Sequence, residues 1–320
     1  MRDDGARDAV KAYASNIAKI QKCKLRGEAL HKFELKFRTV KDRQETLSIH
    51  SKHWAHKRGV YSDLFGPGWC DMKSAEDLPS DLQYDSRLIR TRLGEYYLCV
   101  PMQLQPRGES QAPDPALDSV VSLDPGVRTF MTAYSTDGQV VEWGPGDATR
   151  ISRLGAAFDK LSSKIKARGI VHRQRYKMKR AALRIQAKIR HIVDELHHKT
   201  AKWLCSNFRV VLIPVFKTQQ MVTRGTDGKR RLGSKTARAM CSWSHHRFRM
   251  CLHAKARESP WCKVIDTTEE FTTKTCGGCG HIDKTIGSKK EYKCNSCGFE
   301  ADRDHNGARN VLIRYMSLGN

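Results

Sequence analysis

The chain has 320 residues, enough for a hydrophobic core and for two domains. Its 58 Lys and Arg residues outnumber 34 Asp and Glu residues, and the formal net charge of +24 favours a polyanionic partner, because phosphate binding releases counterions. An acidic membrane surface would attract the same charge, but no apolar run approaches the roughly 18 residues of a spanning helix, and the sequence has neither a secretory signal nor a lipidation motif.

The chain contains eleven cysteines. Four of them form two C-x2-C pairs near the C-terminus, and the other seven are scattered. Because an odd, scattered set does not fit a disulfide framework, we expect a reducing intracellular compartment. The scattered cysteines are Cys23, Cys70, Cys99, Cys205, Cys241, Cys251 and Cys262.

The N-terminal part predicts one helix followed by β-structure. Apolar residues at helical spacing predict a helix over 8–25, and alternating apolar and polar residues over 32–50 predict half-exposed strands. Residues 87–101 have the pattern of a β-hairpin that turns near Gly94, with basic and aromatic residues interleaved as in nucleic-acid-binding surfaces. A small β domain without such a partner would give much the same pattern. Residues 104–118 are polar, contain three prolines and are the best candidate for a linker.

Three strands are expected after this linker. Val120–Asp124 is apolar enough for a buried strand and ends at an aspartate. A second strand runs through Tyr134, and Asp137-Gly138 then turns the chain into a third strand, Gln139–Trp143. Further expected elements are strands at 209–214 and 261–266 and a helix within 235–256.

The segment Lys160–Arg190 contains twelve Lys and Arg residues and no Asp or Glu. The helix in this region places Ile185, Ile189 and Ile192 on one face, so its charges lie on the other faces. A charge run is usually only a solvated face, but the lack of any balancing acid favours nucleic-acid contact. The candidate nucleic-acid-binding residues are Lys164, Lys166, Arg173, Arg175, Lys177, Lys179 and Arg180.

The two C-x2-C pairs are Cys276-Gly-Gly-Cys279 and Cys294-Asn-Ser-Cys297, with fourteen residues between them. This spacing suits a tetrahedral four-thiolate zinc site, in which each pair directs two sulfurs at one ion. Four unligated thiols are the alternative.

The order of the elements predicts an α/β domain of the RNase H-like type. A strand that ends at Asp124, an antiparallel hairpin, a helix, further strands and a last helix opened by Asp304 would bring carboxylates to one cleft. Two Mg²⁺ ions roughly 3.5–4 Å apart require such oxygen ligands. One ion activates the attacking water, and the other stabilises the leaving 3′ oxygen of a phosphodiester.

Three motifs in combination resemble one family. They are Leu123-Asp-Pro-Gly-Val-Arg128, Thr273-Lys-Thr-Cys-Gly-Gly-Cys-Gly280 and Asp302-Arg-Asp-His-Asn-Gly-Ala-Arg-Asn310. The chain resembles the transposon-encoded OrfB/TnpB proteins and, more closely, the Fanzor proteins of eukaryotes and viruses. These are relatives of the type V CRISPR effectors, with a RuvC nuclease domain that carries a zinc-ribbon insertion. Residues 33–54 and 87–101 also resemble the wedge β-barrel of that family.

The resemblance implies an RNA-guided DNA endonuclease that hydrolyses phosphodiesters. Its partners would be a guide RNA and a target DNA, and no membrane. It would hold structural Zn²⁺ and catalytic Mg²⁺ or Mn²⁺, and would work in the nucleus if eukaryotic or viral and in the cytoplasm if prokaryotic.

Two of the catalytic, metal-binding acids carry over directly. Asp124 matches the first RuvC acid, and Asp304 matches the third. Asp302 is better interpreted as a helix-capping residue.

The second acid departs from the family pattern. The family usually has Glu after the strand at 210–214, where this chain has Val215, which cannot bind Mg²⁺. In the Fanzor branch the glutamate stands on the strand that leads into the zinc ribbon, and spacing there selects Glu269, with Glu270 as the second choice. Strand alternation allows only one of the two into the cleft. Two solvated acids at a strand end are the alternative.

The fold class expected is therefore α/β, with an RNase H-like (RuvC) nuclease domain after a small wedge-type β domain. Because the family has a longer front end, a gene fragment, a decayed copy and a minimal natural form all fit this start. The expected parts are a helical remnant of a recognition lobe at 1–30, a wedge-like β domain at 31–110, a linker at 111–118 and the nuclease domain at 119–320, with a basic helical insertion at 150–207 and a zinc ribbon at 272–300.

Three functions follow from the sequence. The leading one is a transposon-associated, RNA-guided, Mg²⁺-dependent DNA endonuclease. A catalytically inactive or truncated RNA- and DNA-binding relative is the alternative that Val215 favours. A generic zinc-ribbon nucleic-acid-binding protein without a guide is the third.

Overall fold

A computed structural model of the chain separates into two compact units, Met1–Gln103 and Leu104–Asn320. The expected domain bounds near residues 30, 110 and 118 stay predictions. The residues that the structure describes are 2–27, 30, 33–35, 44–54, 74–113, 119–216, 218–223, 232–268, 272–283 and 290–317.

The first unit contains a long helix and a small antiparallel sheet. Its elements are α1 (Arg2–Leu25), β1 (Gln44–Ile49), a 3-10 turn (Ser51–His53), β2 (Ser86–Thr91) and β3 (Tyr96–Cys99). The strands pair in the order β1-β2-β3, and Ile49 is the buried centre of a small apolar cluster with Leu47, Leu88 and Leu98. This core is small, because few side chains of the three-stranded sheet are buried in it.

The structure confirms the helix expected at 8–25 and the hairpin expected at 87–101. Gly94 turns that hairpin with φ +82°, a conformation that glycine adopts without strain. The prediction of a strand around residue 33 is wrong, since Phe33–Leu35 is irregular and the Phe33 ring packs edge-on against Tyr13 at 5.7 Å. Residue 32 and residues 36–43 of that prediction lie outside the described residues, and β1 confirms its last part.

The second unit is built on a five-stranded sheet with the strand order β6-β5-β4-β7-β8. β4 runs antiparallel to β5 and parallel to β7, and β8 is parallel to β7. The elements are a 3-10 turn (Glu109–Gln111), β4 (Val120–Pro125), β5 (Met131–Ser135), β6 (Val140–Trp143), α3 (Pro145–Lys166), α4 (His172–Asn207), β7 (Val210–Pro214), α5 (Thr218–Val222), α6 (Ser234–Trp243), α7 (His245–Ala256), β8 (Lys263–Thr267), β9 (Glu291–Lys293), β10 (Glu300–Asp302) and α8 (Arg303–Ser317).

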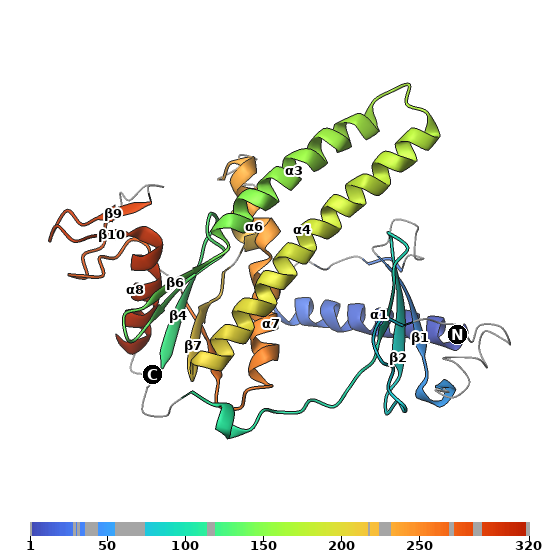
Figure 1. Ribbon diagram of the computed structural model, residues 1–320, viewed down its shortest axis with the longest axis horizontal. Coiled ribbons are helices and arrows are strands. Elements are labelled where there is room, and N and C mark those ends of the chain that lie inside the picture. Colours follow the sequence, from blue (N-terminus) through green and yellow to red (C-terminus); the bar gives the residue numbers. More distant parts are fainter. Residues whose placement is uncertain are drawn as a thin grey trace. The chain divides into compact units, whose positions relative to one another are not determined.

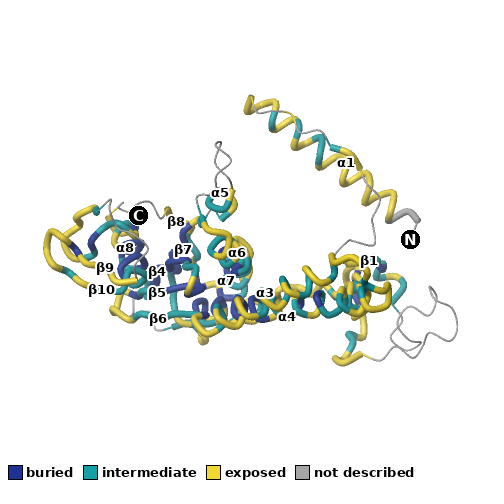
Figure 2. Tube along the Cα trace, turned by 90° about the horizontal axis from the view of Figure 1, so that it is seen from above, coloured by how far each residue is buried: buried dark blue, intermediate teal, exposed yellow. Residues whose placement is uncertain are grey.

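Helices cover both faces of this sheet, as Figure 1 shows. On one face Val121 and Leu123 pack into the main core with residues of α4 and α7, such as Leu204 and Phe248. On the other face Leu212 packs against Val311 and Leu312 of α8. Because successive strand residues point to opposite faces, Ser122 and Asp124 lie on the α8 face. Figure 2 shows the buried residues concentrated on the central strands and α8.

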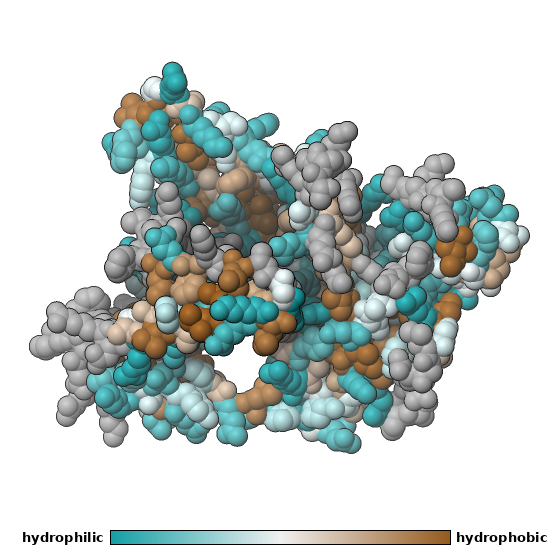
Figure 3. All heavy atoms as spheres, turned by 180° about the vertical axis from the view of Figure 1, so that it is seen from behind, coloured by the Kyte–Doolittle hydropathy of each residue, from teal (hydrophilic) through white to brown (hydrophobic). Residues whose placement is uncertain are grey.

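The helices α3 and α4 form an antiparallel hairpin that extends away from the sheet (Figure 1). Gly169, with φ +80°, lies in the connection between them. Hydrophilic side chains are spread widely over the face of the molecule seen in Figure 3. Among the helices that the structure describes, none combines the length and apolar composition required of a membrane-spanning segment.

Candidate active site and metal centre

Asp124 lies next to the carboxyl end of β4, beneath the last helix. Its residue is only 8% exposed, on the face that α8 covers. The next residue on that face, Ser122, donates a hydrogen bond of 2.7 Å from its hydroxyl to the carbonyl of Ala308 on α8. The strand and the helix are thus joined directly beside the carboxylate.

Gly307 permits a close approach of α8 to Asp124. A Cβ added at Gly307 would lie 2.7 Å from Oδ2 of Asp124, closer than a real Cβ can approach. Any larger residue would push either the helix or the carboxylate away. The glycine of the Asn-Gly-Ala motif is therefore required by the packing at the site.

Asp304 begins the same helix, three residues before Gly307 and on the same helix face. Asp302 caps the helix, because its Oδ1 accepts a hydrogen bond of 2.9 Å from the amide of Asp304, and this confirms the capping interpretation. Burial raises the pKa of Asp304, Asp302 and Glu142 raise it further, and Arg303 and Lys290 oppose the shift. A cation placed near Asp304 would relieve this cost.

Glu142 is a third carboxylate on this face, and the sequence analysis missed it. In the sheet register Asp124 is opposite Thr132, and Thr132 is opposite Glu142, so the three side chains lie in one row on one face. His305 of α8 reaches this row with Nε2 3.0 Å from Oε1 of Glu142. In the sequence, the only indication that Glu142 belongs to the site was its place on a strand expected to pair within the same sheet as the strand of Asp124.

Glu142, Asp302 and His305 offer ligand atoms that all lie within 4.8 Å of one another. Carboxylate and imidazole groups at this separation are able to bind a divalent cation. However, Lys290 already pairs with Asp302 at 3.2 Å, and the three side chains are partly exposed. The same three side chains therefore equally fit an ordinary ion-pair network at the start of α8, with no metal ion bound.

The loop after Asp124 is held by buried side chains. Trp243 donates a hydrogen bond of 2.9 Å from Nε1 to the carbonyl of Val127, and Nε2 of His245 lies 3.2 Å from the carbonyl of Gly126. A Cβ at Gly126 would lie 2.5 Å from the carbonyl oxygen of Thr129, so this turn also needs glycine. These contacts fix the backbone that follows the candidate catalytic acid.

Val215, where the family usually has an acid, follows β7 and is 36% exposed. Its amide donates a hydrogen bond of 3.1 Å to the carbonyl of Thr267, the last residue of β8. Glu269 comes two positions after Thr267 in the sequence. Glu269 and Glu270 lie outside the described residues, so their carboxylates are not placed.

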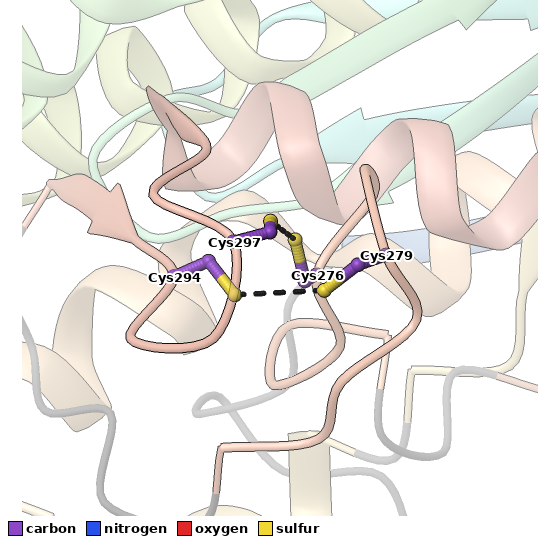
Figure 4. Close-up of side chains that lie close together, drawn as sticks. All are labelled: Cys276, Cys279, Cys294 and Cys297. Carbon is purple, nitrogen blue, oxygen red and sulfur yellow. Dashed lines mark hydrogen bonds between the residues drawn. The ribbon is translucent and has the colours of Figure 1, made fainter.

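The four cysteines of the predicted ribbon converge on one point, as Figure 4 shows. The sulfur atoms of Cys276 and Cys297 are 3.7 Å apart, and those of Cys279 and Cys294 are also 3.7 Å apart. All four sulfurs lie within 4.8 Å of one another. A tetrahedron with Zn–S bonds of about 2.3 Å has edges of about 3.8 Å, so the four thiols fit a structural zinc ion.

Backbone amides donate hydrogen bonds to two sulfurs of this cluster. The amide of Gly278 donates to the sulfur of Cys276 at 3.3 Å, and the amide of Ser296 donates to the sulfur of Cys294 at 3.4 Å. Burial alone would raise the pKa of Cys276, but backbone amides and the neighbouring thiols lower it to about 7. Thiolates are the form that binds zinc.

The ribbon is attached to α8 by two buried asparagines. Asn306 accepts a hydrogen bond of 2.9 Å from the amide of Gly277 and donates one of 2.8 Å to the carbonyl of Thr275. Asn310 donates to the carbonyls of Thr272 and Thr275 at 2.8 and 2.6 Å. The zinc cluster and the helix that carries Asp304 are therefore one connected piece of structure.

The predicted nucleic-acid-binding residues lie on the α3–α4 hairpin. Arg175 and Arg180 are half-buried, and Arg175 donates to the carbonyl of Ala167 at 3.4 Å. The other five are exposed, namely Lys164, Lys166, Arg173, Lys177 and Lys179. Their contact with nucleic acid stays a prediction.

Known proteins are similar to this chain in sequence. Residues 245–311 match the family model of the Cas12f1-like TNB domain. A TnpB-like protein of Acanthamoeba polyphaga mimivirus is 26% identical over 88% of this chain and 52% of its own length. A candidate transposase of Paramecium bursaria Chlorella virus 1 is 28% identical over 95% of this chain and 67% of its own length.

The chain is thus similar in sequence to TnpB-like proteins and to candidate transposases. The four-cysteine cluster lies inside the segment that matches the TNB domain model. A candidate RNA-guided DNA endonuclease of Escherichia coli, InsQ, is 26% identical over 78% of this chain and 61% of its own length. The chain thus spans less than two thirds of several of these TnpB-like relatives. Among solved structures, a Cas12f1–sgRNA–target DNA complex matches 71% of this chain and 45% of that chain, with 14% identity and a TM-score of 0.46.

Proposed function

We propose that this protein is an RNA-guided, Mg²⁺-dependent DNA endonuclease of the TnpB type, with an RNase H-like (RuvC) nuclease domain. The observation that carries the proposal is the contact between Gly307 and Asp124, which puts α8, and with it Asp304, on the face of the sheet where Asp124 lies. The strand order β6-β5-β4-β7-β8 supports the RNase H-like assignment. The sequence similarity to TnpB-like proteins supports the nuclease class.

In this proposal Asp124, Asp304 and Glu269 hold the catalytic metal. Bound Mg²⁺ would supply a charge that activates water and stabilises the leaving oxygen. The protein's own contribution is to hold Asp124 rigidly between β4 and α8 and to keep Asp304 partly buried. The raised pKa of Asp304 makes it a group whose ionised form is stabilised by a cation.

We further propose that Glu269 replaces the acid that is missing at Val215, as in the Fanzor branch. β8 pairs with β7 up to the Pro214–Thr267 pair. The end of β8, from which the chain continues to Glu269, therefore lies beside Val215. Relatives from viruses fit this branch. A guide RNA is the proposed partner because a relative, InsQ, is named an RNA-guided DNA endonuclease.

A plasmid-cleavage assay with the full chain, its native RNA and a matching target tests the proposal. We expect Mg²⁺-dependent cleavage that disappears in Asp124→Ala and in Glu269→Gln but persists in Glu270→Gln. Absence of cleavage by the wild-type protein would contradict the nuclease proposal.

The second candidate is an inactive RNA- and DNA-binding relative, which Val215 favours. The variant Val215→Glu separates the two candidates. Cleavage gained only in that variant would show an inactive site that regains its acid, whereas wild-type cleavage lost in Asp124→Ala would exclude this candidate.

A further inference from the structure

A groove with a volume of about 650 Å³ lies between α3, α4 and α6. This volume is in the range of sites that enclose small organic groups such as nucleobases. Its apolar surface includes Ile151 and Phe158 of α3, Ile189 of α4 and Trp243 of α6. The groove is separate from the carboxylates and from the zinc cluster, and neither proposed role uses it.

The wall formed by α3 is open because of a glycine in the middle of the helix. Gly155 lines the groove, and a Cβ added there would meet nothing within 4 Å. Glycine is a poor helix former, so this position lowers the stability of α3 and leaves the groove wide. The adjacent Ala156 and the facing Ala239 also leave room.

The rim of the groove carries positive charge next to the apolar floor. Lys235 and Arg238 line it from α6, and Arg238 forms an ion pair across the groove with Asp159 of α3. Both partners of this pair are about half exposed, so its net contribution is small and a phosphate can compete for the guanidinium. An apolar floor with a cationic rim is the pattern of proteins that bind unpaired strands, with bases on aromatic and apolar side chains and phosphates on the basic ones.

The inner end of the groove lies at the loop that follows Asp124. Val127 lines the groove and lies three residues after Asp124. Trp243 lines the groove as well and donates a hydrogen bond to the carbonyl of Val127. A strand lying in the groove would therefore lead to the loop that follows the carboxylate.

We propose that this groove binds one unpaired DNA strand, the substrate strand, and guides it to Asp124. The inference rests on the proposed nuclease function, which supplies the reason for DNA. Bases would contact Phe158 and Ile189, and phosphates would contact Lys235 and Arg238.

The test measures binding of fluorescein-labelled oligo-dT of about 16 nucleotides to the full chain with Ca²⁺ in place of Mg²⁺. Gly155→Trp fills the groove, and we expect it to weaken binding by at least about fivefold, the effect of losing one stacked base. The matched control is Gly146→Trp, on the same helix and also in open space but outside the groove, which we expect to stay within about twofold.

Charge variants give a second readout that does not depend on the bulk of tryptophan. Arg238→Gln is expected to weaken binding. It is also expected to lower, by about one, the slope of the logarithm of the binding constant against the logarithm of the salt concentration. Asp159→Asn is expected to tighten binding, because it frees Arg238 and removes a negative charge. If the ion pair between Arg238 and Asp159 were merely structural, both variants would bind oligo-dT more weakly than the wild type.

Equal oligo-dT binding by wild type, Gly155→Trp and Arg238→Gln would overturn the groove proposal. Stronger groove-dependent binding of oligo-U or of a duplex would overturn the assignment to unpaired DNA. Plasmid cleavage separates failure of the nuclease proposal from failure of the groove proposal. A wild-type protein that does not cleave DNA but still shows groove-dependent binding would contradict only the nuclease proposal.

Discussion

At the scale of single residues, the site depends on positions where a larger or a charged side chain is not tolerated. Gly307 lies against the carboxylate of Asp124, and Gly126 lies against the carbonyl of Thr129. His245 is buried and stacks on Phe130 with ring centroids 5.4 Å apart. Gly307 and His245 each permit a specific prediction about stability.

The substitution Gly307→Ala is expected to destabilise the protein by about 1–3 kcal/mol, because the added methyl group overpacks the site. The same change at Gly155, which faces open space in a helix interior, is expected to stabilise it by about 0.5–1 kcal/mol. Urea denaturation of both variants measures the difference. A Gly307→Ala protein as stable as Gly155→Ala would show that α8 does not approach Asp124 closely.

The fold is expected to lose stability in mild acid because of two buried histidines. Burial lowers the pKa of His197 and of His245 to about 4, against an ordinary value of 6.5. The unfolded chain therefore binds more protons between these values, and stability present above pH 6.5 is lost as the pH falls toward 4. Each histidine contributes up to about 3 kcal/mol to this loss.

Urea midpoints at about pH 7.5 and about pH 5 measure this acid sensitivity. His245→Gln is expected to reduce the difference between the two midpoints, and the exposed His246→Gln is the matched control. An unchanged difference in His245→Gln would mean that its imidazole is not buried in the neutral form.

At the scale of elements, the hairpin α3–α4, the sheet and the zinc ribbon have different degrees of predictability. The strand at Val120–Asp124 and the zinc cysteines could be predicted because each is a local pattern, an apolar run or a fixed spacing. Glu142 could not, because its place beside Asp124 depends on the strand register through Thr132. The approach of Gly307 to Asp124 joins residues far apart in the chain, and no local pattern predicts it.

Removal of zinc is expected to disturb the candidate active site as well as the ribbon. Asn306 and Asn310 bond to backbone beside Cys276, so an open cluster would free the start of α8. Cys294→Ser is expected to lose zinc, melt at a lower temperature and cleave DNA more slowly. The control is Cys241→Ser, an exposed cysteine outside the cluster. Elemental analysis, thermal denaturation and plasmid cleavage measure the three effects, and full cleavage by a folded Cys294→Ser protein would contradict this coupling.

At the scale of the whole molecule, the net charge is +24. The affinity of such a protein for a polyanion depends mainly on the salt concentration. The Lys and Arg residues of the α3–α4 hairpin are the part of this charge that the sequence analysis assigned to nucleic acid. Shape-specific recognition would come on top of this electrostatic attraction.

Binding to nucleic acid is expected to weaken by about 10³-fold or more between about 50 and 200 mM salt, if six or more phosphates are neutralised. Lys177→Gln and Lys179→Gln are each expected to reduce the logarithmic salt slope by about one. Lys202→Gln changes an exposed lysine of the same helix outside the basic segment, and should leave the slope unchanged. Equal slopes in all four proteins would assign the binding surface elsewhere.

The hydrogen bond between Ser122 and Ala308 joins residues separated by 186 positions. Closing so long a loop is slow, and contacts of this kind form late in folding. During synthesis at about 5–20 residues per second, β4 would leave the ribosome many seconds before α8. The carboxylates therefore stay apart in a nascent chain, and an incomplete copy of the protein would hold no assembled carboxylate site.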